Sequence, residues 1–108
     1  MVRYGLHGER HAAWTAACRR AGVTPQRALV ALLGLALGTH QGRCDLTLGL
    51  ALHRRDRHTQ AVVGMFSAAM PARCRWRPDA ELQAVVRDTA AALDTDYRHQ
   101  RAPLDAIA

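Results

Sequence analysis

The sequence predicts a domain of the mixed α/β (α+β) class, in which about three helices pack on a small sheet. The chain has 108 residues, 49% of them hydrophobic, which suits a single domain with a modest core. An apolar run from Ala28 to Leu37 is typical of a buried helix. The leucines between Leu46 and Leu52 alternate with small or polar residues, which is the pattern of a half-buried strand.

The first part of the chain predicts a short strand and two helices. Val2 to Leu6 is expected to be a strand, and a helix is expected from about Glu9 to Gly22, since glycine is a common helix end. Thr24 followed by Pro25 begins the next helix, because a hydroxyl caps the first turn and proline needs no amide donor there. This helix is expected to run to about Thr39.

The helix from Pro25 to Thr39 is predicted to be the most buried element of the fold. We expect its core residues to be Leu29, Val30 and Leu32. Gly34 and Gly38 lie four residues apart and should let another element approach closely.

Two strands and a last helix follow. The second strand is expected from about Met65 to Trp76, with Pro71 ending its pairing because proline cannot donate to a sheet ladder. Beyond Pro71, Ala72, Cys74 and Trp76 should form an apolar face, and Arg73, Arg75 and Arg77 a solvated one. The last helix is expected to open at Pro78-Asp79, with Asp79 as its cap. Its apolar face is expected to consist of Leu82, Val86, Leu93 and Tyr97, and Pro103 prevents its continuation.

Several classes of function are disfavoured by composition. The net charge is +6, but aromatic residues are 5% and no helix-turn-helix or zinc module appears, so we expect no nucleic-acid partner. His7 and His11 lack a third ligand nearby, so we expect no metal site. The cysteines (Cys18, Cys44 and Cys74) are odd in number and form no CxxC pair, which favours reduced thiols in a cytoplasmic protein. No apolar run is long enough to span a bilayer, and the first residues do not resemble a signal peptide.

Catalytic sequence motifs are also absent from the chain. It contains no GxSxG elbow, no phosphate-binding loop and no GxGxxG fingerprint. The residues alone therefore indicate no self-contained catalytic constellation.

Two stretches resemble the condensation domains of nonribosomal peptide synthetases. The stretch VVGMFSAAMPARCR (residues 62–75) is similar to a GxFxNxxPxR-type segment of that family, and HQRAPLDAI (residues 99–107) to an HQxxPxxxI-type segment. The matching residues are Gly64, Phe66, Pro71 and Arg73 in the first stretch, and His99, Gln100, Pro103 and Ile107 in the second. Both occur in the family's order with a helix between them, and the resemblance extends over essentially the whole chain.

This resemblance implies a fold and an activity. The family's domain is several times longer and has two lobes, each like chloramphenicol acetyltransferase, with a tunnel between them. It joins acyl or aminoacyl groups carried as thioesters on phosphopantetheine arms. This chain resembles the first part of the second, C-terminal lobe, so residues 1–108 are expected to form a single partial domain. The family's catalytic HHxxxDG motif is missing here, so the chain alone is expected to be inactive and to hold no catalytic residue.

The resemblance also implies site residues and partners. Tunnel-lining residues would be Gly64, Phe66, Ser67, Ala68 and Pro71, with Ala68 standing where the family often has asparagine. Structural motif residues would be Arg73, His99, Gln100 and Pro103. Ser67 to Ala69 are small either because they face the lobe junction or because a helix packs over them.

The implied partners are the other lobe and peptidyl carrier proteins, whose phosphopantetheine would be the only cofactor. The alternative is a small non-catalytic interaction domain that binds a partner or its own copy.

Overall fold

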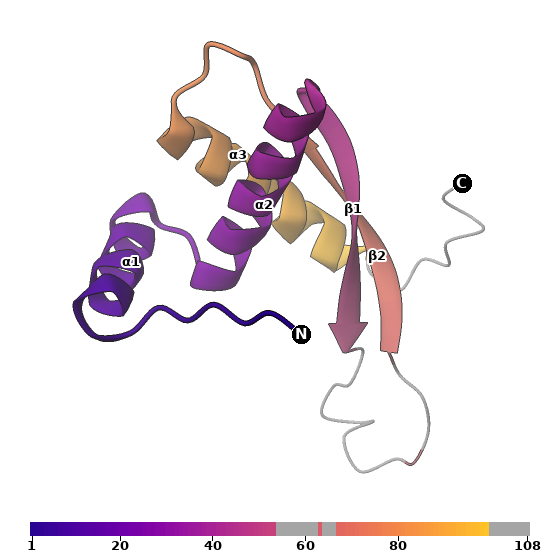
Figure 1. The fold of residues 1–108 in the computed structure, drawn as a ribbon. Helices are drawn as coiled ribbons and strands as arrows, with labels where there is room; N and C mark the ends of the chain where they lie inside the picture. The colour runs from indigo at the N-terminus through magenta and orange to yellow at the C-terminus, as the bar shows by residue number, and fades with distance from the viewer. Residues whose placement is uncertain (54–62, 64–66, 100–108) are drawn as a thin grey trace.

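The computed structural model describes residues 1–53, 63 and 67–99 (Figure 1). The elements follow in the order α1 (Gly8–Ala21), α2 (Pro25–Gln41), β1 (Asp45–His53), β2 (Ser67–Arg75) and α3 (Leu82–Arg98). Strands β1 and β2 form an antiparallel hairpin, and α2 and α3 pack against it. Helix α1 lies on the far side of α2 from the hairpin (Figure 1). The predicted mixture of helices and a small sheet is confirmed.

The hairpin continues through Pro71, which corrects the expectation that pairing ends there. Pro71 lies opposite Gly49 in the middle of the ladder. The Trp76 amide donates to the Cys44 carbonyl at 3.0 Å, and hydrogen-bonded pairs alternate with non-bonded pairs in an antiparallel ladder. Pro71 is an odd number of positions from Trp76, so its nitrogen faces away from β1. The proline therefore removes no hydrogen bond from the hairpin.

Two apolar clusters make up the core. One lies where the three helices meet and the other lies between the hairpin, α2 and α3. The first contains Cys18, Ala28, Ala31 and Val86, and the second Met70, Ala72 and Leu93. The predicted alternation of β2 is confirmed, since Ala72 and Cys74 are buried while Arg73 and Arg75 are exposed.

The small residues of α2 are buried and its large ones are not, which corrects the sequence expectation. Its buried residues are Ala28, Ala31, Gly34 and Gly38. Leu29 is 56% exposed, and Val30 and Leu32 are half-buried. Helix α3, with five buried residues, is more buried than α2 with four. The physical reason is close approach, because a helix that lies tightly against its neighbours can place only small side chains between them.

Glycine permits that close approach, as the sequence predicted. A Cβ atom built on Gly34 would lie 2.7 Å from the Sγ atom of Cys74, and one built on Gly38 would collide with the Trp76 ring. Both contacts join α2 to the end of β2. The absence of a Cβ atom at both positions therefore allows α2 to lie this close to the hairpin.

Two predictions, the strand at residues 2–6 and the start of the last helix, are wrong. Residues 1–7 form no strand in the structure, and Tyr4 is 95% exposed, because no neighbouring strand in the described part of the chain pairs with them. Helix α3 begins at Leu82 with Glu81 as its N-cap, so Asp79 is not the cap. Asp79 instead accepts a hydrogen bond from Arg77 at 3.0 Å.

The predicted apolar face of α3 is confirmed in part. Val86 and Leu93 are buried and Tyr97 is half-buried. Leu82 is 55% exposed because it lies in the first turn of the helix, beyond the main core. Thr89, Val85 and Ala90 complete the buried face instead.

Within the described residues, no single helix combines the length and apolarity needed to cross a membrane. Helices α1 and α2 meet these two criteria only when taken together, and a bend of 93° separates them.

Substitution of Gly34 by alanine should destabilise the chain by about 1–3 kcal/mol, because the new methyl group overpacks the contact with Cys74. Gly49→Ala is the matched control, since a Cβ atom there meets nothing within 4 Å. Urea unfolding of both variants measures the difference. Equal midpoints for Gly34→Ala and the parent would show that this contact does not limit the packing of α2.

Candidate functional site

One face of the hairpin has small residues at its centre, and no helix among the described residues covers it. Gly49 lies opposite Pro71, and Ala51 lies opposite Ala69. Gly49, Ala51 and Ala69 are exposed and Pro71 is half-buried. We call these four residues the small-residue face. Helix α3 packs on the opposite face of β2, where Met70 and Ala72 are buried.

The exposure of Ala69 bears on one of the alternatives that the sequence left open. Its side chain is exposed, so no helix among the described residues packs over it. The space above the neighbouring strand is also open, because a Cβ atom on Gly49 would meet no atom within 4 Å. The small-residue face is therefore a flat surface on which another chain or a ligand can lie close to the backbone.

An ion cluster borders this face at one end. Arg73 Nε donates to Asp45 Oδ1 at 2.9 Å, and its second nitrogen donates to Oδ2 at 2.6 Å. Arg75 Nε lies 3.5 Å from the same Oδ2. Asp45 is opposite Arg75 in the register, and Arg73 reaches it diagonally across the hairpin. The bidentate pair fixes the orientation of the Arg73 guanidinium.

Charge and hydrogen bonding shift both members of the pair. The hydrogen bond from Arg73 is the main cause that lowers the pKa of Asp45 below its ordinary value of 3.8, and it outweighs partial desolvation. The same hydrogen bond raises the pKa of Arg73. Arg73 is thus a charged residue with a partner in its own hairpin, which fits the structural role that its motif position implies.

Asp45 was not singled out from the sequence. It stands at the end of the stretch HQGRCD, which reads as a turn, and its partner is 28 residues away. Only the strand register brings the two together. The available signal was an acidic residue directly before one predicted strand and an arginine near the end of the next.

The other residues predicted for the site are partly outside the described chain. Gly64, Phe66, Gln100 and Pro103 lie outside the described residues, as does Ile107. Ser67 and Ala68 lie at the start of β2, opposite His53 and Leu52. His99 is exposed at the end of α3, where its amide donates to the Asp96 carbonyl at 3.0 Å. The structure therefore places Ser67, Ala68, Pro71 and Arg73 along one strand, and His99 on another element.

No metal centre is formed by the residues that the structure places. Among them, no three histidine, cysteine, aspartate or glutamate side chains come together.

Comparison with known proteins identifies the family. The family model of the condensation domain matches residues 2–108. The chain belongs to the condensation-domain family. Its relatives include the AMB antimetabolite synthetase AmbB of Pseudomonas aeruginosa, which is 32% identical over 98 residues, or 90% of this chain. This assigns the chain to the condensation domains of nonribosomal peptide synthetases, as the two sequence segments predicted.

Solved condensation domains share its fold. The first condensation domain of the calcium-dependent antibiotic synthetase superposes with a TM-score of 0.81 at 24% identity over 92% of the chain. The condensation domain of the monacolin K polyketide synthase MokA superposes with a TM-score of 0.77 at 24% identity over 84% of the chain. This condensation-domain chain spans 23% and 21% of those two structures and 8% of AmbB.

The pKa of Asp45 should depend on Arg73. The ion pair is fully formed above pH 3.8, and its contribution is lost as the pH falls through the lower pKa of the folded state. In Arg73→Gln the pKa should rise toward 3.8, as measured by NMR titration of the carboxyl carbon. Arg77→Gln is the control, since Arg77 pairs with Asp79. An Asp45 pKa that is the same in all three proteins would contradict the bidentate pair.

Proposed function

We propose that this chain is a fragment of a condensation domain, the first part of its C-terminal lobe, and that its small-residue face lines the passage for carrier-bound substrates. The observation that carries the proposal is the uncovered face of Gly49, Ala51, Ala69 and Pro71. Pro71 belongs to the segment that resembles the family's motif. The chain's small share of its relatives' length supports the fragment status.

The chemistry of this face suits the passage of a carrier-bound acyl or pantetheine arm. Its side chains carry no hydrogen-bonding group, so a slender acyl or pantetheine arm would slide over methyl groups and backbone without being held. The absence of large side chains lets that arm approach the backbone closely. The family resemblance would also assign Gly64, Phe66, Ser67 and Ala68 to this passage.

Carrier proteins would be the partners of such a surface. Condensation domains work with carrier proteins in nonribosomal peptide synthetases, and those proteins carry phosphopantetheine. Of the two arginines that border the face, Arg73 is engaged by two hydrogen bonds, whereas Arg75 makes a single longer contact with Asp45. Arg75 is therefore the better placed of the two to meet the phosphate of a carrier arm.

The proposed contribution to the reaction is positioning. General-base catalysis of amide formation needs a proton acceptor within hydrogen-bond reach of the attacking amine. The sequence contains no adjacent histidine pair and hence no HHxxxDG motif. The chain would therefore supply one wall of the passage while the other lobe supplies the acid–base chemistry.

Substitutions of increasing size at Gly49 test whether the small-residue face lines the passage. Residues 1–108 are placed in a complete condensation domain in exchange for the matching segment, and dipeptide formation from two loaded carrier proteins is measured. Gly49→Leu should lower the rate at least about tenfold, which is a barrier increase of about 1.4 kcal/mol. Gly49→Ala, the matched control, should stay close to the parent because the added methyl group meets no atom. A folded Gly49→Leu domain with the parent's rate would overturn the proposed passage.

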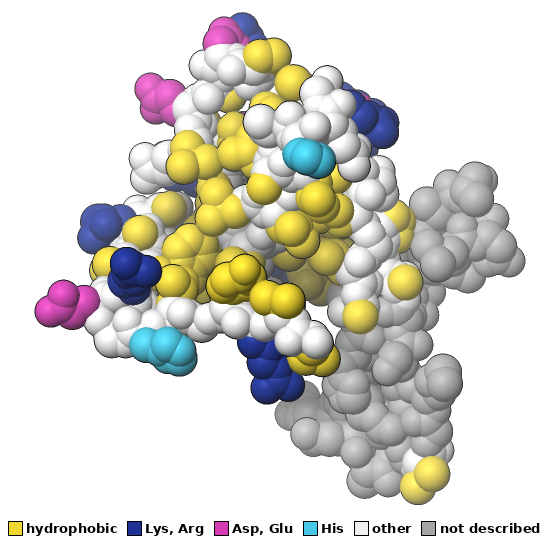
Figure 2. All heavy atoms as spheres, in the orientation of Figure 1, with side chains coloured by type: hydrophobic (Ala, Val, Ile, Leu, Met, Phe, Trp, Pro, Cys, Tyr) yellow, Lys and Arg dark blue, Asp and Glu magenta, His cyan; other side chains and the backbone are white. Residues whose placement is uncertain are grey.

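A second candidate function, self-association or partner binding, is favoured by the exposed side of α2. Leu29, Leu33 and Leu37 are four residues apart and are 56%, 53% and 36% exposed. Figure 2 shows hydrophobic side chains gathered over α2 and along its border with α1. Exposed apolar surface of this kind marks a contact with a further protein surface. In the fragment the rest of the domain would cover it, and in a free-standing domain a second copy would.

Self-association of the isolated chain should increase with salt. The net charge of +6 opposes contact between copies, and salt screens it over about 10 Å at 0.1 M. Sedimentation at low and high salt should show a larger species at high salt for the parent, and less of it for Leu33→Glu. Leu82→Glu is the control, because Leu82 is equally exposed on another helix. A monomer under both conditions would exclude this surface as a self-association site.

A further inference from the structure

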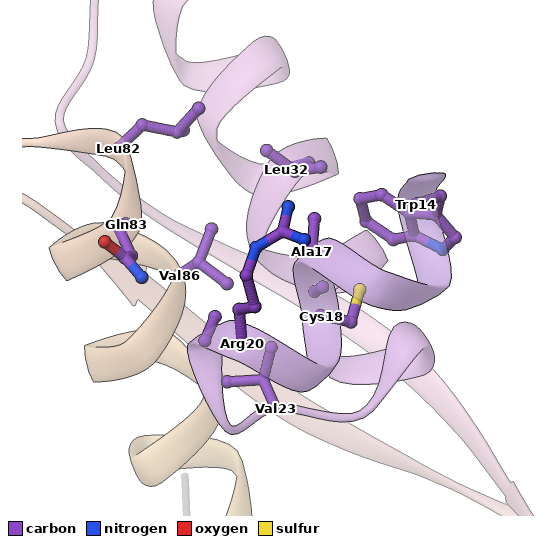
Figure 3. Close-up of a pocket in the computed structure, with 11 residues that line it drawn as sticks. Trp14, Ala17, Cys18, Arg20, Val23, Leu32, Leu82, Gln83 and Val86 are labelled. Carbon is purple, nitrogen blue, oxygen red and sulfur yellow. The ribbon is translucent and has the colours of Figure 1, made fainter. Parts of the chain in front are cut away.

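A cavity of about 250 Å³ lies between the three helices, away from the small-residue face. Helix α1 contributes Trp14 and Cys18, α2 contributes Leu32, and α3 contributes Val86 (Figure 3). This volume exceeds the ~150 Å³ of an engineered apolar cavity that binds benzene. The cavity opens to solvent, and its walls are mainly apolar side chains.

The cavity follows from the composition of α1. Of the α1 residues that line the cavity, Ala17, Cys18 and Ala21 are small, and Cys18 is the one buried residue of the helix. Small side chains cannot fill the space toward α2 and α3. Trp14 and Leu32 consequently remain half-buried, each with one side against the core cluster and the other toward the cavity. The hollow is thus lined by large apolar groups that lack a packing partner on one side.

Two polar side chains stand at its opening. Arg20, from the last turn of α1, extends over the cavity toward Leu32 and Val86, and Gln83 lies on the α3 side (Figure 3). None of the ion pairs formed within the described residues includes Arg20. An apolar chamber with a guanidinium and an amide at its rim is the usual layout of a small-molecule site.

We propose that this cavity binds a small amphipathic carboxylate of about eight carbons, a size set by comparison with the benzene-binding cavity. Its apolar body would lie between Trp14, Leu32 and Val86. Its carboxylate would accept two hydrogen bonds from the Arg20 guanidinium and one from the Gln83 amide nitrogen. The guanidinium selects an anionic head over a neutral or cationic one. This site is separate from the passage proposed above and does not depend on it.

Binding of octanoate to the 15N-labelled 108-residue chain tests the proposal, at concentrations below those at which octanoate aggregates. The Trp14 indole signal should shift saturably, and that of Trp76, which does not line the cavity, should stay in place. Octanol should bind at least about tenfold more weakly than octanoate, because it cannot form the bidentate charged pair. The absence of a saturable shift at Trp14 would overturn the proposal.

Three variants distinguish the contribution of the apolar cavity to binding from that of the Arg20 charge. Ala17→Phe fills the chamber from an exposed position of α1 and should abolish binding of octanoate and octanol alike. Arg20→Gln should weaken octanoate about tenfold and leave octanol unchanged. Arg19→Gln is the matched control, since the neighbouring arginine does not line the cavity, and it should bind like the parent. Equal octanoate affinities in Arg20→Gln and Arg19→Gln would refute the assigned role of Arg20, and unchanged binding in Ala17→Phe would refute the site.

Discussion

The close contact between α2 and the end of β2 is the constraint on which the rest of the structure depends. Gly34 lies against the Cys74 side chain and Gly38 lies under the Trp76 ring, so α2 itself contributes no side chain at these two contacts. Arg27 holds the other end of α2, where it pairs with Asp94 at 2.6 Å and lies 5.2 Å from the centre of the Tyr97 ring. These contacts fix α2 against both the hairpin and α3.

This close approach determines where the large side chains go. Because alanine and glycine occupy the inner side of α2, leucines such as Leu29 and Leu33 must point outward. The same shortage of large inward side chains on α1 leaves the cavity beside Trp14 unfilled. Both the exposed leucines and the cavity are therefore consequences of one feature, an inner surface built from small residues.

Local signals in the sequence predicted the elements well, and the packing less well. Thr24 caps α2 by accepting a hydrogen bond from the Arg27 amide at 3.3 Å, as expected from the Thr-Pro pair, and the leucine alternation correctly predicted β1. The exposure of Leu29 could not be predicted, because a helix that is apolar all round gives no information on which side is covered. Asp45 was missed because its partner Arg73 is brought close only by the strand register.

The two faces of the hairpin place different demands on the residues of β2. One face must hold α3, so β2 places Met70 and Ala72 there. The passage proposed above would need the other face to stay flat, and a large side chain there would rise above it. Pro71 serves both needs, since its ring is compact and its nitrogen lies on the outer edge, where β1 requires no donor. A proline one position earlier or later would remove a bond from the ladder. The position of Pro71 within the motif is thus set by the parity of the hydrogen-bond pattern.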